Sequence, residues 1–126
     1  MTEQQYYGPA EEMIAKIQAA GKDPYKKALD YLTQAKKNGE FSFTLKEMNS
    51  TETIFDLVIK RIPTGYNIVY ADYPEVTCLK FSFFAFQREK DMAKQLTKEL
   101  IAMAYCSDIA IKQYSIDVCR AQGMDV

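Results

Sequence analysis

Hydrophobic and polar residues along the chain follow first a helical and then a strand-like period. From Pro9 onward apolar residues recur at spacings of three and four, which predicts a helix that begins at Pro9 and stops at Gly21. A second helical stripe begins after Asp23, the expected N-cap, and ends at Gly39. The short link between these helices predicts a helical hairpin. Residues 1–8 are expected to form a flexible N-terminal tail.

The period then changes to two, which is typical of half-buried strands. Residues 41–46 and 66–71 alternate clearly, and residues 75–87 form the most hydrophobic strand. Residues 52–62 fit a helix at spacing four and also a strand, and their β-branched and aromatic side chains favour the strand. The turn residues at 63–65 separate two neighbouring strands. Strands joined by such tight turns predict an antiparallel meander.

A helical period returns from Arg88. Its apolar stripe consists of Met92, Leu96, Leu100 and Met103. Residues 109–119 fit either a further helix or, from 114, a strand. The expected order is therefore α-α-β-β-β-β-α-α, an antiparallel meander sheet packed by helices in a single α+β domain of residues 9–123. If 52–62 were a helix and 114–119 a strand, the chain would instead hold a ferredoxin-like β-α-β-β-α-β core preceded by an N-terminal helical hairpin.

Composition describes an ordinary globular chain. It has 126 residues, 48% of them hydrophobic and 26% charged, with a formal net charge of −1. No apolar run approaches the roughly 18 residues of a membrane span, and the first residues lack the basic and apolar regions of a secretory signal. The 3 cysteines are an odd number and form no CxxC pair, which favours a reducing compartment. We therefore expect a cytoplasmic protein with no membrane contact.

The absence of histidine removes most familiar catalytic chemistry. Serine and cysteine nucleophile systems that use a histidine base are excluded, as are zinc sites built on histidine. The glycines are scattered singly and form no phosphate loop. The remaining carboxylate candidates lie in a first helical turn, on a strand or beside strand turns: Glu11, Glu12, Asp56, Asp72 and Glu75. The sequence therefore indicates a non-enzymatic protein with no catalytic residue, metal or cofactor.

Aromatic residues are the unusual feature of the predicted sheet. Large aromatics fall on both faces of the strand at 75–87, so either both faces are covered by helices or one of them is a binding surface. Tyrosines cluster on the neighbouring strand, and tyrosine is enriched at protein interfaces. The candidate protein-binding residues are Tyr66, Tyr70, Tyr73, Phe81 and Phe83. We expect a small protein-binding module, such as an adaptor, inhibitor or immunity-type protein, and self-association is compatible with it.

Two alternatives remain open. The stretch from Lys80 to Phe86 resembles the RNP1 strand of RNA-recognition motifs, which implies single-stranded nucleic-acid binding through stacking on Phe81 and Phe83. In that alignment Lys80 stands where the motif has glycine, and Leu79 where it has a basic residue, and a pI near 5.5 argues against a nucleic-acid partner. The other alternative is a small-ligand pocket between helix and sheet.

Overall fold

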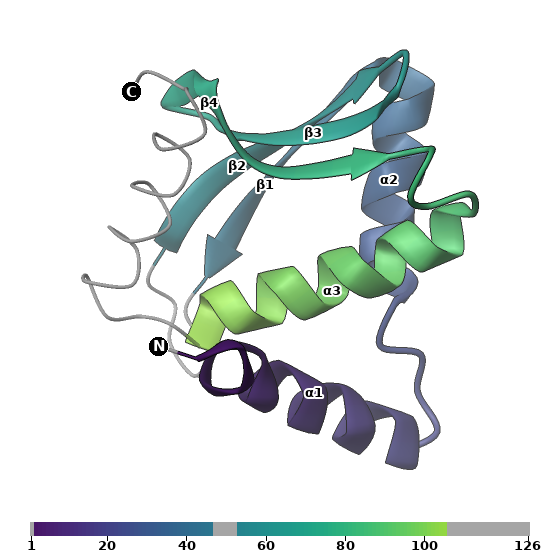
Figure 1. The fold of residues 1–126 in the computed structure, drawn as a ribbon, viewed down its shortest axis with the longest axis vertical. Coiled ribbons are helices and arrows are strands. Elements are labelled where there is room, and N and C mark those ends of the chain that lie inside the picture. Colours follow the sequence, from purple (N-terminus) through teal and green to yellow (C-terminus); the bar gives the residue numbers. More distant parts are fainter. Residues whose placement is uncertain (1, 47–52, 106–126) are drawn as a thin grey trace.

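The chain folds as an α+β protein in a computed structural model that describes residues 2–46 and 53–105. Its elements are α1 (Glu3–Ala19), α2 (Lys26–Asn38), β1 (Glu40–Lys46), β2 (Thr53–Ile62), β3 (Gly65–Tyr70), β4 (Tyr73–Ser82) and α3 (Glu89–Tyr105), shown in Figure 1. The order α-α-β-β-β-β-α confirms the expected class. The predicted element at 109–119 lies outside the described residues.

The four strands form one open antiparallel sheet in the order β1-β2-β3-β4, which confirms the meander. Residues 53–62 of the ambiguous segment form strand β2, so the ferredoxin-like alternative is wrong. The reason is pairing on both sides: Ile59 lies opposite Phe41 in β1 and opposite Ile68 in β3. Both Leu57 and Ile59 are fully buried, because alternate positions of β2 face the same core.

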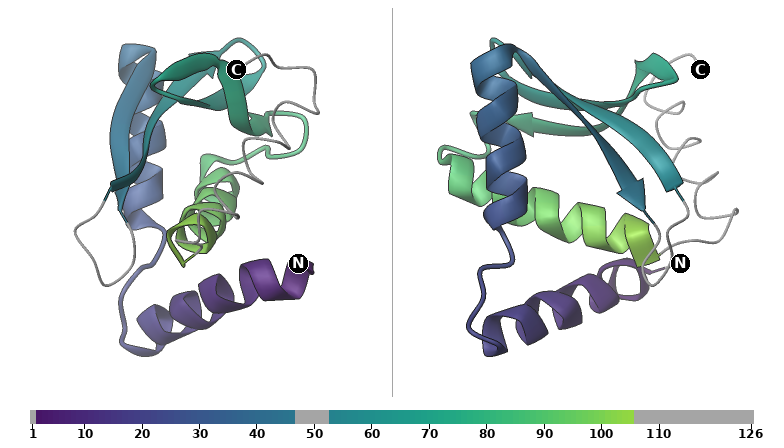
Figure 2. Two further views of the ribbon diagram at one scale, coloured as in Figure 1. Left: turned by 90° about the vertical axis from the view of Figure 1, so that its left-hand side faces the viewer. Right: turned by 180° about the vertical axis from the view of Figure 1, so that it is seen from behind.

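The molecule has three layers: the sheet, then α2 with α3, then α1 (Figures 1 and 2). The helices α2 and α3 pack on one face of the sheet, and α1 packs on the side of α3 away from it. The predicted hairpin of α1 with α2 is therefore wrong, because each of these helices packs on α3. In the contact between α1 and α3, the Tyr7 hydroxyl donates a 2.7 Å hydrogen bond to the Glu99 carboxylate. None of the described helices is long and apolar enough to cross a membrane.

Helix α1 begins earlier than its sequence pattern indicates. The expected start at Pro9 is wrong, and most of the segment expected to be a flexible tail is helical from Glu3. A capping box explains this start: Thr2 Oγ1 accepts from the Gln5 amide at 3.2 Å, and Gln5 Oε1 accepts from the Thr2 amide at 2.8 Å. The capping box thus starts the helix before Pro9, which lies within it.

The β2–β3 hairpin turns at Pro63 and Thr64, as predicted, and then passes very close to β4. Gly65 has a φ of +156°, and a Cβ atom built there would lie 1.8 Å from the Phe81 carbonyl oxygen. Only glycine fits this close approach between strands.

Strand β4 is shorter than predicted. It ends at Ser82 rather than near residue 87, and a turn at 83–85 follows. The amides of Ala85 and Phe86 both donate to the Ser82 carbonyl, at 3.1 and 2.9 Å, and so bend the chain away from the sheet. The aromatics after Ser82 therefore do not alternate between two faces of a strand.

Candidate functional site

Three of the five predicted binding residues belong to the core. The side chains of Tyr66, Tyr70 and Phe81 are 0, 4 and 3% exposed, since they lie on the sheet face covered by α2 and α3. The two others lie apart: Tyr73 begins β4 and Phe83 follows its end. The expectation of one surface made by these five side chains therefore does not hold.

The resemblance to an RNA-stacking strand fails for the same reason. Stacking requires aromatics on an open sheet face. Phe81 is buried, and its ring packs edge-on against Phe86 with centroids 5.5 Å apart. Phe83 lies beyond the strand and packs against Tyr66.

The turn after β4 instead presents a different aromatic residue. Phe84 is 97% exposed, by far the most of the large hydrophobic side chains in the described part of the chain. Its amide donates to Ser82 Oγ at 3.1 Å, and the preceding Phe83 amide donates to the Thr64 carbonyl at 3.0 Å. The rings on either side of Phe84 pack into the protein, so the turn holds Phe84 outward in a defined position.

This turn lies at one end of the sheet where basic residues gather. The end of α2, the hairpin of β2 with β3, the end of β4 and the start of α3 meet here, in residues 36–40, 60–66 and 80–91, which we name the basic end. These segments hold seven of the 16 basic side chains but only three of the 17 acidic ones. The basic end therefore carries +4, against −5 for the rest of a chain whose net charge is −1.

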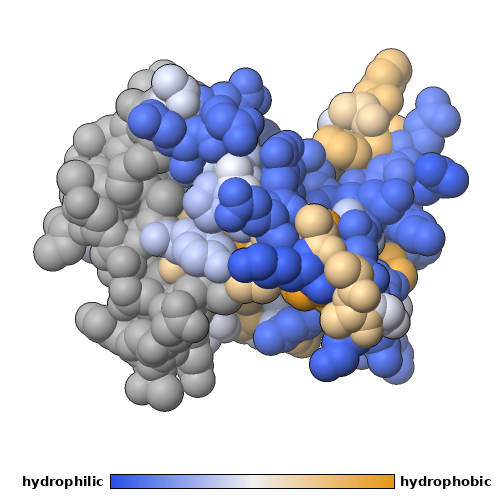
Figure 3. All heavy atoms as spheres, turned by 90° about the horizontal axis from the view of Figure 1, so that it is seen from below, coloured by the Kyte–Doolittle hydropathy of each residue, from blue (hydrophilic) through white to orange (hydrophobic). Residues whose placement is uncertain are grey.

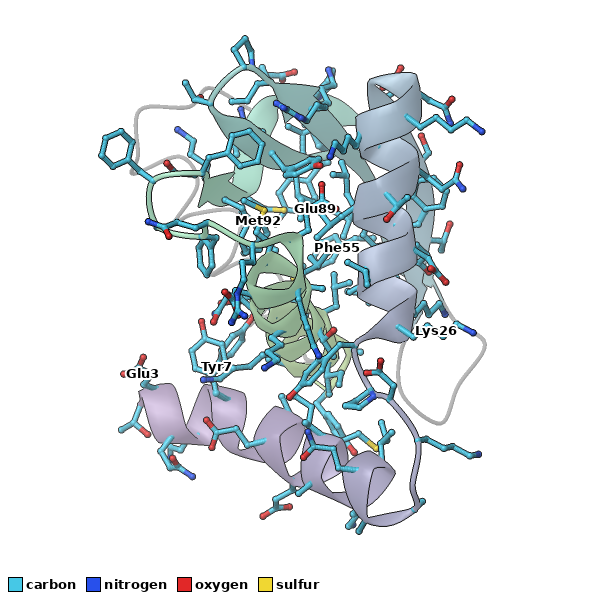
Figure 4. The ribbon with its side chains drawn as sticks, turned by 90° about the vertical axis from the view of Figure 1, so that its right-hand side faces the viewer. Glu3, Tyr7, Lys26, Phe55, Glu89 and Met92 are labelled. Carbon is cyan, nitrogen blue, oxygen red and sulfur yellow. The ribbon has the colours of Figure 1, made fainter. Side chains whose placement is uncertain are left out.

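A cavity of about 280 Å³ opens at the basic end between the two helices and the sheet. We name it the Tyr66 pocket; its lining consists of Lys36, Arg61, Tyr66, Phe83, Gln87, Glu89 and Met92. Glu89 and Met92 come from the first turn of α3, and both side chains extend toward the sheet and α2 (Figure 4).

Arg61 supplies the uncompensated charge of the pocket. Its guanidinium lies 4.5 Å from the ring centroid of Phe83 and 5.5 Å from that of Tyr66. Its Nη1 donates to the carbonyls of Ile62 and Gly65, and no described residue accepts from Nε or Nη2. Arg61 forms no ion pair within the described ranges, so stacking on two rings holds a cation that lacks a counter-ion.

The other charges of the pocket neutralise each other. Lys36 of α2 and Glu89 of α3 form a salt bridge of 3.2 Å. Tyr66 is fully buried, and within the described residues no group meets its hydroxyl in hydrogen-bonding geometry; its polar neighbours are the Glu89 carboxylate and the Arg61 guanidinium. Burial raises the pKa of Tyr66, and the nearby Glu89 carboxylate raises it further while Arg61 opposes the rise. The hydroxyl therefore stays protonated, between a carboxylate and a guanidinium.

A second, larger cavity is less informative. It is a mostly apolar groove of about 450 Å³ between α2, β1 and the second half of α3, lined by Ala28, Tyr31, Phe43 and Leu100 among others. It contains no buried polar group without a partner. Within residues 2–46 and 53–105, no three acidic or cysteine side chains gather to hold a metal ion.

Comparison of the chain with protein-family models, with curated proteins and with solved structures finds no match. The geometry of the basic end is therefore the basis for assigning a function.

Proposed function

We propose that the protein is a small protein-binding module whose anchor is Phe84, and that its partner has an apolar pocket with an acidic rim. The observation that carries this proposal is the outward position of Phe84, which is 97% exposed at the tip of a hydrogen-bonded turn. A rigid exposed aromatic side chain is a typical interface anchor, since it buries a large apolar area at little cost in conformational entropy.

Nothing in the fold requires a phenylalanine at this position. The neighbouring Phe83 and Phe86 contribute to the core, whereas Phe84 contacts solvent. The face of the molecule that carries α1 is mainly hydrophilic, with only small hydrophobic patches (Figure 3). The feature that supports binding is therefore the single protruding side chain of Phe84.

Charge indicates the chemistry of the partner. Phe84 belongs to the basic end, whose charge of +4 favours an acidic rim around the partner's pocket. It also disfavours a two-fold contact between copies of this chain, because two basic ends would face each other. Stacking of a nucleic-acid strand generally uses several aromatic residues, whereas Phe84 stands alone at this end among the exposed large hydrophobics of the described residues.

The test compares the proteins retained from a nuclease-treated host lysate by the tagged wild type, by Phe84→Ala and by Tyr73→Ala. Tyr73 is 47% exposed at the other end of β4 and is the matched aromatic control. We expect a stoichiometric partner that Tyr73→Ala retains and Phe84→Ala loses, with all three proteins equally stable. Purification of that partner then shows whether its contact surface is acidic.

Three results would contradict the proposal. If Phe84→Ala retains every stoichiometric partner of the wild type, the anchor is wrong. Binding that nuclease abolishes and that weakens steeply with salt would assign a nucleic acid instead. A wild-type dimer that Phe84→Ala dissociates would assign a second copy, which sedimentation of the purified protein detects.

A further inference from the structure

We propose that the Tyr66 pocket binds a small-molecule carboxylate through the Arg61 guanidinium and the Tyr66 hydroxyl. This inference goes beyond the proposed function, since it needs no partner protein. It rests on two groups that line the same cavity: a half-buried cation that forms no ion pair within residues 2–46 and 53–105, and a fully buried hydroxyl that meets no group of those residues in hydrogen-bonding geometry.

Both groups are held in place before a ligand arrives. Arg61 and Tyr66 are cross-strand neighbours in the β2–β3 hairpin, and the ring of Phe83, in the turn after β4, packs against both. Nε and Nη2 of Arg61, which donate to none of the described residues, lie along one edge of the planar guanidinium and match the two oxygens of a carboxylate. The Tyr66 hydroxyl supplies a third donor, and its raised pKa keeps the proton on the oxygen at neutral pH.

The charge of the pocket favours a single negative charge. Lys36 and Arg61 against Glu89 give a net +1, which one carboxylate neutralises. A phosphate dianion would exceed that charge, and the Glu89 carboxylate would repel its two charges more strongly than the single charge of a carboxylate. The walls formed by Phe83 and Met92 suit a short apolar or aromatic body. A volume of about 280 Å³ falls just below the roughly 300–1,000 Å³ of sites that hold drug-sized ligands.

The test titrates the purified protein with benzoate and follows amide and arginine side-chain resonances by heteronuclear NMR. Benzyl alcohol, which lacks the charge, and inorganic phosphate are the comparison ligands. We expect saturable shifts confined to the Tyr66 pocket with benzoate, and much weaker binding of both comparison ligands.

Variants assign the binding to the named groups. Arg61→Gln should weaken benzoate binding at least about tenfold, as expected for the loss of charge-assisted hydrogen bonds, and Tyr66→Phe about threefold or more. Glu89→Gln should strengthen it, because a repelling charge is removed. Lys22→Gln removes a positive charge from the exposed link between α1 and α2 and should leave binding unchanged.

Several results would overturn the inference. These are no saturable shift with benzoate, tighter binding of phosphate or benzyl alcohol than of benzoate, or an equal loss in Lys22→Gln and Arg61→Gln. If Arg61→Gln fails to fold, Tyr66→Phe decides, and benzoate binding unchanged in that variant overturns the role of the hydroxyl. Because the titration uses the isolated protein, its outcome is independent of whether Phe84 anchors a partner.

Discussion

Replacing Tyr66 by phenylalanine removes one buried hydroxyl for which the described part of the chain offers no partner in hydrogen-bonding geometry. Burying such a group costs about 1–3 kcal/mol, because its hydrogen bonds to water are lost without replacement. The ring contacts with Phe83 and Arg61 remain in the variant. We therefore expect Tyr66→Phe to stabilise the ligand-free protein by about 1 kcal/mol, although tyrosine-to-phenylalanine changes at bonded sites destabilise.

Tyr7→Phe is the matched comparison, since the Tyr7 hydroxyl donates to the Glu99 carboxylate at 2.7 Å. Its loss should destabilise the protein by about 1–2 kcal/mol, the value of a hydrogen bond to a charged group in a half-buried site. Urea unfolding measures both variants. With a slope of about 1–3 kcal/mol per molar urea, each change moves the midpoint by several tenths molar, in opposite directions. A destabilised Tyr66→Phe would mean that the hydroxyl has a partner in solution and would refute the reasoning.

Two further predictions concern the turn glycines and alkaline pH. Gly65→Ala should lower the free energy of unfolding by about 3 kcal/mol or more, because its Cβ would lie 1.8 Å from the Phe81 carbonyl oxygen. Gly21→Ala should lower it by only about 1 kcal/mol, since Gly21 has a φ of +76° but no atom within 4 Å of the added Cβ. Urea midpoints compare the two variants, and equal losses of stability would contradict the close approach at Gly65. Burial, reinforced by the hydrogen bond to Glu99, raises the pKa of Tyr7 well above its ordinary value of 10.0, so the folded state keeps a proton that the unfolded state loses. Stability should therefore fall as the pH rises above about 10, less steeply in Tyr7→Phe than in the wild type, and parallel midpoint-against-pH curves would contradict this.

The sequence predicts most of the fold because local periods and turn residues agree with it. The stop of α2 is confirmed, since Gly39 adopts a φ of +88°. The meander is confirmed because two tight turns join β2, β3 and β4. The start of α1 differs from the expectation because proline is favoured at the first helical position, whereas here the cap formed by Thr2 and Gln5 starts the helix at Glu3, before Pro9.

The candidate site was less predictable, because it depends on tertiary placement. Period two continues through the aromatics to Phe86, so the sequence pattern does not reveal that β4 stops at Ser82. The pattern therefore places Phe81 and Tyr66 on a candidate binding surface and Phe84 on the opposite face of the strand. Arg61 belongs to no sequence motif, and Phe83, on which it stacks, comes from the separate turn after β4.

One available signal was missed. In a meander, every second turn lies at the same end of the sheet, so the charges of segments 36–40, 60–66 and 80–91 can be added together from the sequence. The overall net charge of −1 conceals that gathering. Charge is thus better counted by sheet end than by chain once a meander is expected.

The dissociation constants of the purified partner for the wild type and for Phe84→Ala decide whether Phe84 is the anchor; titration calorimetry measures them, with Tyr73→Ala as control. A central aromatic anchor contributes about 2–4 kcal/mol, so we expect a loss of affinity of roughly 30- to 1,000-fold for Phe84→Ala and little change for Tyr73→Ala. Equal affinities of the wild type and Phe84→Ala would contradict it.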